Sequence, residues 1–156
     1  MRVVRLVDAR FVRDVEIVEN VPIYHGELTL PEAFSSVAEA RRFVRATLAD
    51  WPVDCCLDDV ELVVSELVGN ALRHGRGRPV LRLHGMPDRL RVEVFDESPD
   101  VPTPRACGAD GGWGLYLVER IATAWGVLPH PKGKVVWCEL PAASAGMSAA
   151  GRHGSR

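Results

Sequence analysis

One long amphipathic helix in the middle of the chain constrains the fold most, because its two ends and its apolar side are all visible in the sequence. Asp54 is a good N-cap, and Arg73 and His74 would lie at the negative end of the helix dipole. Gly75 comes after them, and we expect it to take the left-handed conformation that ends many helices. The apolar side has to be covered by other elements, so the sequence predicts a single globular domain built around this helix.

Segments on both sides of this helix carry the patterns of strands and further helices. Alternating apolar and polar residues predict strands, and apolar residues spaced three and four apart predict helices. Ser36 is the expected cap of the first helix. Together these elements predict an α+β fold, a two-layer α/β sandwich in which a mixed, mainly antiparallel sheet carries its helices on one face. The expected strands cover 26–30, 80–84, 90–95 and 135–140, and the other helices run from 36 to 48 and from 114 to before Gly126.

The chain divides into three parts by the clarity of these patterns. Residues 1–27 carry short β-branched runs with no clear relationship to the rest of the chain, and we treat them as an N-terminal extension of uncertain structure. Residues 28–141 form the expected domain. Residues 142–156 are rich in Ala, Gly and Ser and have no periodicity, so we expect a disordered tail.

The charge balance argues against several classes of partner. The chain has 19 basic and 21 acidic side chains and a formal net charge of -2, so no overall positive field attracts nucleic acid or an anionic membrane. Charged residues interrupt the N-terminus before a signal-peptide core forms, and no apolar run is long enough to span a membrane. We therefore expect a cytoplasmic protein that binds neither nucleic acid nor membrane directly.

The cysteine spacing favours free structural thiols over metal or redox chemistry. Cys55 and Cys56 are adjacent, and the other two, Cys107 and Cys138, are isolated. The sequence has no Cys-x-x-Cys pair and no nearby histidine at metal-ligand spacing, so we expect neither a zinc site nor a disulfide framework.

A polar pair interrupts the densest apolar stretch of the chain. Glu66 and Asn70 are four residues apart and therefore share one side of the helix. The plain interpretation is a solvated notch at the helix edge. Within an apolar run, however, each unpaired polar group would cost about 1 to 3 kcal/mol in desolvation. A hydrated Mg²⁺ held by the amide oxygen would remove that cost, and the carboxylate could orient or deprotonate a nucleophile.

An acid and a group of glycines further along could complete a nucleotide site. Asp96 ends a strand before Ser98, where it either accepts backbone hydrogen bonds in an Asx turn or presents its carboxylate to the amine of adenine. Gly112 and Gly114 precede a helix, where they serve the turn alone or let the backbone N–H groups hold phosphate. The chain has neither a Walker sequence nor a Gly-x-Gly-x-x-Gly after a strand, so ordinary P-loop and Rossmann sites are excluded.

Three motifs in this order resemble the GHKL, or Bergerat-fold, ATPases. Residues 66–75, Glu-Leu-Val-Gly-Asn-Ala-Leu-Arg-His-Gly, are similar to the asparagine box of that family. Residues 96–99, Asp-Glu-Ser-Pro, are similar to its first glycine box, and residues 112–115, Gly-Trp-Gly-Leu, to its second. The resemblance spans roughly 28–140 and implies a sandwich of the Bergerat ATPase type. The short length looks closest to the small anti-sigma-factor serine/threonine kinases.

That resemblance implies residue roles and a regulatory activity. Glu66 would be the catalytic base or would orient the attacking group, and Asn70 would be the Mg²⁺ ligand. A protein of this type would bind ATP with Mg²⁺, transfer the γ-phosphate to a serine of an anti-anti-sigma (STAS-type) partner, and hold a sigma factor when that partner is absent. A homodimer is left open. The implied nucleotide contacts are Asn70, His74, Asp96, Ser98, Gly112, Gly114 and Leu115.

Two positions depart from the family pattern. Ser98-Pro99 stands where many members have glycine, which predicts a stiffer turn beside the adenine. Val135 stands where many members have a threonine that helps to bind adenine, which predicts the loss of one polar contact. Two other functions therefore stay open: a non-catalytic, nucleotide-gated regulator that binds other proteins, and a structural domain that has lost ATP.

Overall fold

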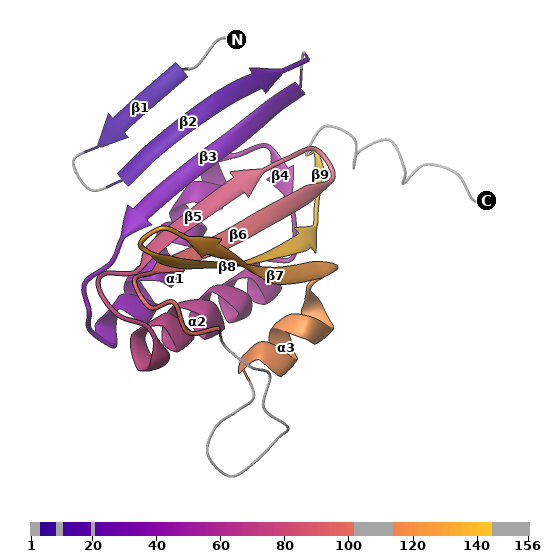
Figure 1. Ribbon diagram of the computed structural model, residues 1–156. Helices are drawn as coiled ribbons and strands as arrows, with labels where there is room; N and C mark the ends of the chain where they lie inside the picture. Colours follow the sequence, from indigo (N-terminus) through magenta and orange to yellow (C-terminus); the bar gives the residue numbers. More distant parts are fainter. Residues whose placement is uncertain (1–3, 9–10, 20, 102–113, 145–156) are drawn as a thin grey trace.

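The described part of the chain is a sheet covered by helices on one face (Figure 1). The computed structural model describes residues 4–8, 11–19, 21–101 and 114–144. Its helices are α1 (Ser35–Asp50), α2 (Leu57–His74) and α3 (Gly114–Ile121). Its strands are β1 (Val4–Asp8), β2 (Phe11–Val18), β3 (Val21–Thr29), β4 (Val53–Asp54), β5 (Val80–Gly85), β6 (Arg89–Asp96), β7 (Ala124–His130), β8 (Gly133–Pro141) and β9 (Ala143–Ser144).

Seven of these strands form the main sheet, in the order β1-β2-β3-β5-β6-β8-β7. Every neighbouring pair in this sheet is antiparallel, so the expected mixture of directions is wrong for the described strands. The two-layer α/β sandwich with helices on one face is confirmed. A second, two-stranded sheet pairs β4 with β9.

The core lies between α2 and the centre of the sheet. Along β5 and β6 every second side chain is buried, as the alternating sequence predicts. Leu83 and Val92, partners in adjacent strands, are both fully buried, as are Val64 and Val68 of α2. Burial of each such side chain stabilises the fold by about 1.5 to 3 kcal/mol, so this contact fixes how α2 sits on the sheet.

The N-terminal segment continues the sheet. β1, β2 and β3 form an antiparallel meander, and β3 pairs with β5. Side chains reinforce that pairing, because Arg82 donates to Glu27 at 2.8 Å and the Nδ1 atoms of His25 and His84 lie 2.8 Å apart. β3 therefore runs across the expected limit between residues 27 and 28, and the proposed domain limits stay a prediction.

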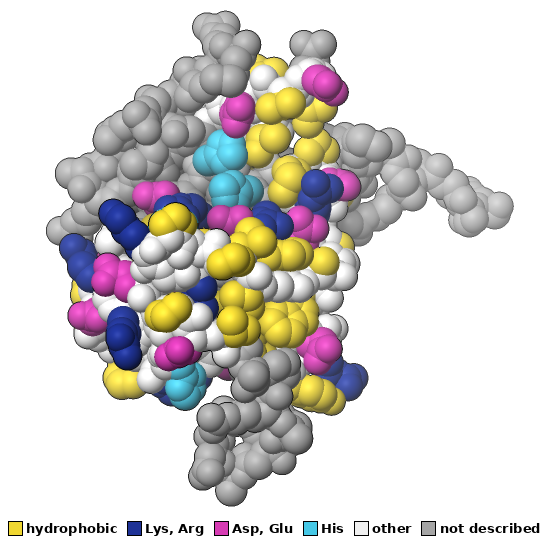
Figure 2. Space-filling view, viewed as in Figure 1, with side chains coloured by type: hydrophobic (Ala, Val, Ile, Leu, Met, Phe, Trp, Pro, Cys, Tyr) yellow, Lys and Arg dark blue, Asp and Glu magenta, His cyan; other side chains and the backbone are white. Residues whose placement is uncertain are grey.

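The sheet face away from the helices mixes apolar, charged and histidine side chains, as Figure 2 shows. The guanidinium of Arg91 lies 4.1 Å from the ring centroid of Trp137 and donates to Glu93 at 2.7 Å. Phe95 and His130 meet edge to face, with ring centroids 4.9 Å apart. The half-buried ring of Trp137 therefore lies beside a charged guanidinium, and that of Phe95 lies beside an imidazole.

The ends of α2 differ from the sequence prediction. Asp54 is not the N-cap, because residues 53–54 form β4 and the helix begins at Leu57 after Cys56. Gly75 has φ −87° and ψ −171°, so it is not left-handed. A glycine is needed there for space instead, since a Cβ would lie 2.4 Å from the carbonyl oxygen of Ala71.

The start of α1 also corrects a prediction. The helix begins at Ser35, and its N-cap position is Phe34 without a side-chain cap bond. Ser36 is buried and donates its hydroxyl proton to the carbonyl oxygen of Pro31 at 2.6 Å. Its role is to hold the turn that leads from β3 into the helix.

The C-terminal part contains two strands that the sequence did not reveal. α3 ends at Ile121, and β7 comes next as an edge strand beside β8. Its sequence, Ala-Trp-Gly-Val-Leu-Pro-His, lacks clean alternation, and its proline is tolerated because the strand has one free edge. Residues 143–144 form β9, so the expected tail from 142 is wrong at its start, and 145–156 lie outside the described residues.

Three of the cysteines are free thiols, and two of them have the burial that we expect of structural thiols. Cys55 is half-buried, Cys56 exposed and Cys138 buried, whereas Cys107 lies outside the described residues. Burial raises the pKa of Cys138 to about 12, so this thiol stays protonated at neutral pH. Among the helices of the described chain, none combines the length and apolar character needed to cross a membrane.

Candidate functional site

α2 carries Glu66 and Asn70 on the flank away from α1. Glu61 marks the α1 flank, since Arg45 of α1 donates two hydrogen bonds to its carboxylate. With about 100° of rotation per residue, Glu66 lies about 140° and Asn70 about 180° around the helix from Glu61. α2 packs against α3 as well as α1. The sequence-predicted pair is therefore together on one flank, away from the α1 contact.

Glu66 lies in the middle of this helix without a partner among the described residues. Its side chain is half-buried, and within the described residues it makes no hydrogen bond or ion pair. Glu61, which sequence reasoning did not single out, is its opposite. Glu61 is 4% exposed, and the hydrogen bond from Arg45 lowers its pKa. The signal that could have separated them is periodicity, because Glu61 falls on the side facing α1.

Asn70 and its neighbours form a small polar surface at the end of α2. Arg73 donates to the amide oxygen of Asn70 at 3.2 Å, one helical turn away. Gly69 has no side chain there, and a Cβ would meet the Arg73 guanidinium at 3.5 Å. His74 is exposed at the last position of the helix. The side chain of Asn70 is half-buried, so a ligand can reach its amide oxygen.

Asp96 ends β6 with a buried carboxylate. It is 2% exposed, and its Oδ1 accepts the backbone N–H of Ser98 at 2.8 Å, so the Asx turn is confirmed. The same oxygen accepts a hydrogen bond from Nζ of Lys134 at 2.9 Å, and Lys134 also donates to the carbonyl oxygen of Ser98 at 3.1 Å. Ser98 is thus held beside Asp96, and the nucleotide contacts expected of both residues stay a prediction.

Lys134 is a buried partner of Asp96 that the sequence did not reveal. It pairs with Asp96 across β6 and β8, and its side chain is only 5% exposed. Val135 does not face Asp96. It pairs with Phe95, whose side chain lies on the sheet face away from the helices. The prediction that Val135 takes the place of a polar contact to adenine is therefore wrong. The turn before β8 gave no signal for this, because a lysine there usually points to water.

Two glycines let the surrounding backbone approach Asp96 closely. A Cβ on Gly75 would lie 2.7 Å from Cγ of Asp96, and one on Gly133 would lie 2.0 Å from its carbonyl oxygen. Gly133 also has φ 156°, a conformation that other residues rarely adopt. The end of α2 and the start of β8 therefore both touch Asp96, which joins the asparagine-box helix to the end of β6.

The second glycine box is only partly described. Gly114 is the first residue of α3, and Leu115 is 6% exposed and packs in the core. Gly112 and Trp113 lie outside the described residues. The predicted helix opening at Gly114 is confirmed, whereas its phosphate contact stays a prediction.

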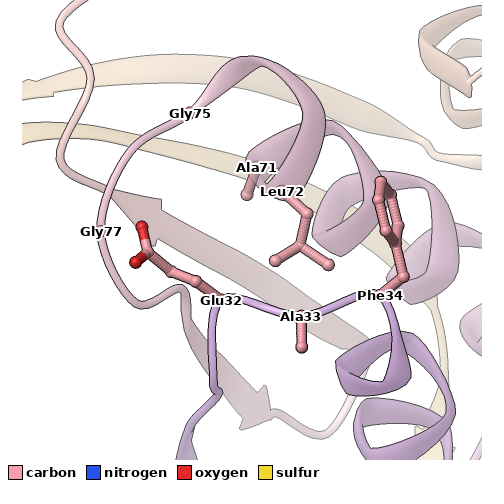
Figure 3. A pocket seen from close by; sticks show the side chains of 7 residues that line it. All are labelled: Glu32, Ala33, Phe34, Ala71, Leu72, Gly75 and Gly77. Atoms are coloured by element: carbon pink, nitrogen blue, oxygen red, sulfur yellow. The ribbon is translucent and has the colours of Figure 1, made fainter.

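A hollow of about 80 Å³ lies between the start of α1 and the end of α2 (Figure 3). It is lined by Glu32, Ala33, Phe34, Ala71, Leu72, Gly75 and Gly77. Glu66, Asn70 and Asp96 do not line it. We therefore do not assign this hollow as the nucleotide site.

Most of the chain matches one protein family. Residues 30–139 match the family model of the histidine kinase-like ATPase domain. The chain belongs to that family. A histidine kinase-like ATPase domain implies ATP binding, and the matched range includes Glu66, Asn70, Asp96 and Lys134.

Part of this histidine kinase-like ATPase domain is similar to a solved histidine kinase domain. The histidine kinase domain from the blue-light activated histidine kinase of Erythrobacter litoralis EL346 is similar at 24% identity, with a TM-score of 0.39. That match covers 55% of this chain and 44% of the other. No curated protein matches.

Proposed function

We propose that the protein is an ATP-binding regulatory serine/threonine kinase of the anti-sigma-factor type. In this proposal it transfers the γ-phosphate of ATP to a serine of an anti-anti-sigma (STAS-type) partner and holds a sigma factor when that partner is absent. The observation that carries the proposal is the pair on α2. Glu66 is half-buried without a described partner, and Asn70 lies one turn away on the same flank.

The side chains present fit ATP with Mg²⁺. Asn70 offers the amide oxygen of a half-buried side chain, an oxygen ligand of the kind that Mg²⁺ prefers. The described residues contain no cluster of three or more His, Cys, Asp or Glu side chains that could hold a metal. A magnesium ion that takes most of its ligands from phosphate and water needs only one such protein oxygen. Bound Mg²⁺ would neutralise charge on the phosphate oxygens.

Glu66 supports transfer to a hydroxyl. Its carboxylate can accept the proton of a serine hydroxyl as the serine oxygen bonds to the γ-phosphorus. The bond from that phosphorus to the bridging oxygen breaks, and ADP leaves. The backbone N–H groups at the start of α3 favour the phosphate charge at this end of the site.

The test is phosphate transfer from labelled ATP to a STAS-type partner. Glu66→Gln keeps the shape of the side chain but removes the proton acceptor, so we expect transfer to fall by about 10² to 10⁴-fold. Glu119→Gln, on the exposed side of α3, is the matched control and should retain the wild-type rate. Equal rates for Glu66→Gln and the wild type would remove the catalytic role from Glu66.

A second function is favoured by the state of Asp96. Its carboxylate already accepts hydrogen bonds from Lys134 and from the backbone N–H of Ser98. This pairing alters the adenine site that the family resemblance implies. A non-catalytic regulator that binds a partner under nucleotide control would need no transfer. Partner binding that responds to ATP, with no labelled partner in the same assay, would support this function over the kinase.

A further inference from the structure

Lys134 is a buried lysine at a position where an apolar side chain could also fill the space. It is 5% exposed, and Asp96 opposite it is 2% exposed. Lysine is almost never this buried unless it is paired, and a buried ion pair is weak as a source of stability because both charges lose their water. A pair of apolar residues would fill the same space without that cost. The Lys134–Asp96 pair therefore calls for a functional explanation.

The hydrogen bonds of the Lys134–Asp96 pair leave one donor and one acceptor without a partner. The ammonium of Lys134 has three N–H donors, of which one goes to Oδ1 of Asp96 and one to the carbonyl oxygen of Ser98. Oδ1 of Asp96 also accepts the backbone N–H of Ser98. Among the described residues, the third N–H of Lys134 and Oδ2 of Asp96 have no partner. One donor of Lys134 and one acceptor of Asp96 therefore remain without a partner in this ion pair.

The position of this donor and acceptor is fixed by the backbone. Gly75 at the end of α2 and Gly133 at the start of β8 approach Asp96 so closely that neither could carry a Cβ without a collision. Asp96 and Lys134 also sit opposite each other in the β6–β8 ladder. Groups held in place before a ligand arrives lose little freedom on binding, which favours recognition by hydrogen-bond geometry.

We propose that Lys134 determines base specificity, by donating a hydrogen bond to the ring nitrogen N1 of adenine while Oδ2 of Asp96 accepts from the neighbouring amine. This inference rests on the proposed ATP site and deepens it. A carboxylate alone would recognise only the amine, whereas the pair matches both groups on that edge of the base. Guanine has a carbonyl where adenine has its amine, so in the same placement it would set oxygen against the Asp96 carboxylate.

Equilibrium binding of base analogues to the full chain tests this directly, with no need for phosphate transfer. Calorimetry would compare ATP with 1-deaza-ATP, which lacks the ring nitrogen but keeps the amine. We expect the wild type to bind 1-deaza-ATP about tenfold or more weakly, since a hydrogen bond to a charged donor is lost. In Lys134→Met the two ligands should bind equally.

The control is Lys132→Met, which removes an exposed lysine two residues away and should keep the wild-type ratio. Equal affinity of the wild type for ATP and 1-deaza-ATP would overturn the role of Lys134, and so would an unchanged ratio in Lys134→Met. Equal affinity of the wild type for the two ligands would overturn the role even if Lys134→Met does not fold. A wild type that binds no ATP at all would overturn the proposed function as well, so the two failures are distinguishable.

Discussion

Two glutamates five positions apart on α2 occupy opposite environments. Glu61 is buried and paired with Arg45, with Arg41 also 3.7 Å from its carboxylate. Glu66 is half-buried and has no described partner. A residue retained in an unpaired, partly desolvated position costs stability, which is common where function rather than folding selects the side chain. The structural role of Glu61 is therefore set by its ion pair, whereas the catalytic role proposed for Glu66 does not conflict with any described contact.

This contrast predicts different stability effects for the same substitution. Glu61→Gln should lower the free energy of unfolding by about 1 kcal/mol at pH 7, the low end expected because both arginines are partly exposed. Glu66→Gln should stay within about 0.5 kcal/mol of the wild type. Urea unfolding of both variants measures the difference, and equal losses would contradict it.

The loss in Glu61→Gln should also depend on pH. Pairing with Arg45 lowers the pKa of Glu61 in the folded protein. Its contribution to stability is therefore complete above the ordinary carboxyl pKa of about 4.3 and disappears as pH falls through the lowered value. The same urea series, repeated in acid, should show the wild type and Glu61→Gln converging. A gap that persists there would mean that packing, not charge, causes the loss.

Among the elements, the join between α2 and the end of β6 depends on one glycine. Gly75 lies against both Ala71 and Asp96, and its N–H donates to the carbonyl oxygen of Ala71 at 2.9 Å. Gly69, in the middle of the same helix, is different. A Cβ there would meet nothing closer than Arg73, at an ordinary contact distance of 3.5 Å. Close packing therefore requires a glycine at position 75, whereas position 69 has room for a side chain.

Alanine at each glycine should change stability in opposite directions. Gly75→Ala forces backbone and Asp96 to move, so we expect a loss of about 1 to 3 kcal/mol. Gly69→Ala should gain about 0.5 to 1 kcal/mol, because alanine orders the helix at a position with room for it. Thermal unfolding followed by circular dichroism compares them. A stabilised Gly75→Ala would show that this contact is not tight.

The sequence was informative where an element is long and periodic. The body of α2 and the β5–β6 hairpin can be predicted from their apolar spacing, and the sandwich from both. The two-residue strands β4 and β9 could not be found, since two residues have no period. β7 was missed for lack of alternation. Lys134 was missed because its burial depends on the β6–β8 register, which brings it opposite Asp96.

At the scale of the whole molecule, ligand binding should be visible as stability. A ligand that binds only the folded protein stabilises it by about 2.7 kcal/mol at a concentration 100 times its Kd. We therefore expect MgATP to raise the melting temperature by about 5 to 11 °C, and Asn70→Ala to remove the part that requires Mg²⁺. Scanning fluorimetry with and without Mg²⁺ measures this. An unchanged melting temperature in the wild type would favour the domain that has lost ATP.

The β3–β5 pairing has a consequence for anyone who shortens this chain. A version starting at residue 28 would keep the family-matched range but lose nearly all of β3, including Glu27 and His25. The backbone N–H and C=O groups of β5 that β3 now satisfies would then form a bare edge, ready to recruit a strand from another molecule. Aggregation of such a fragment would result from the loss of β3 beside β5, and not from a failure of the helices and central strands to fold.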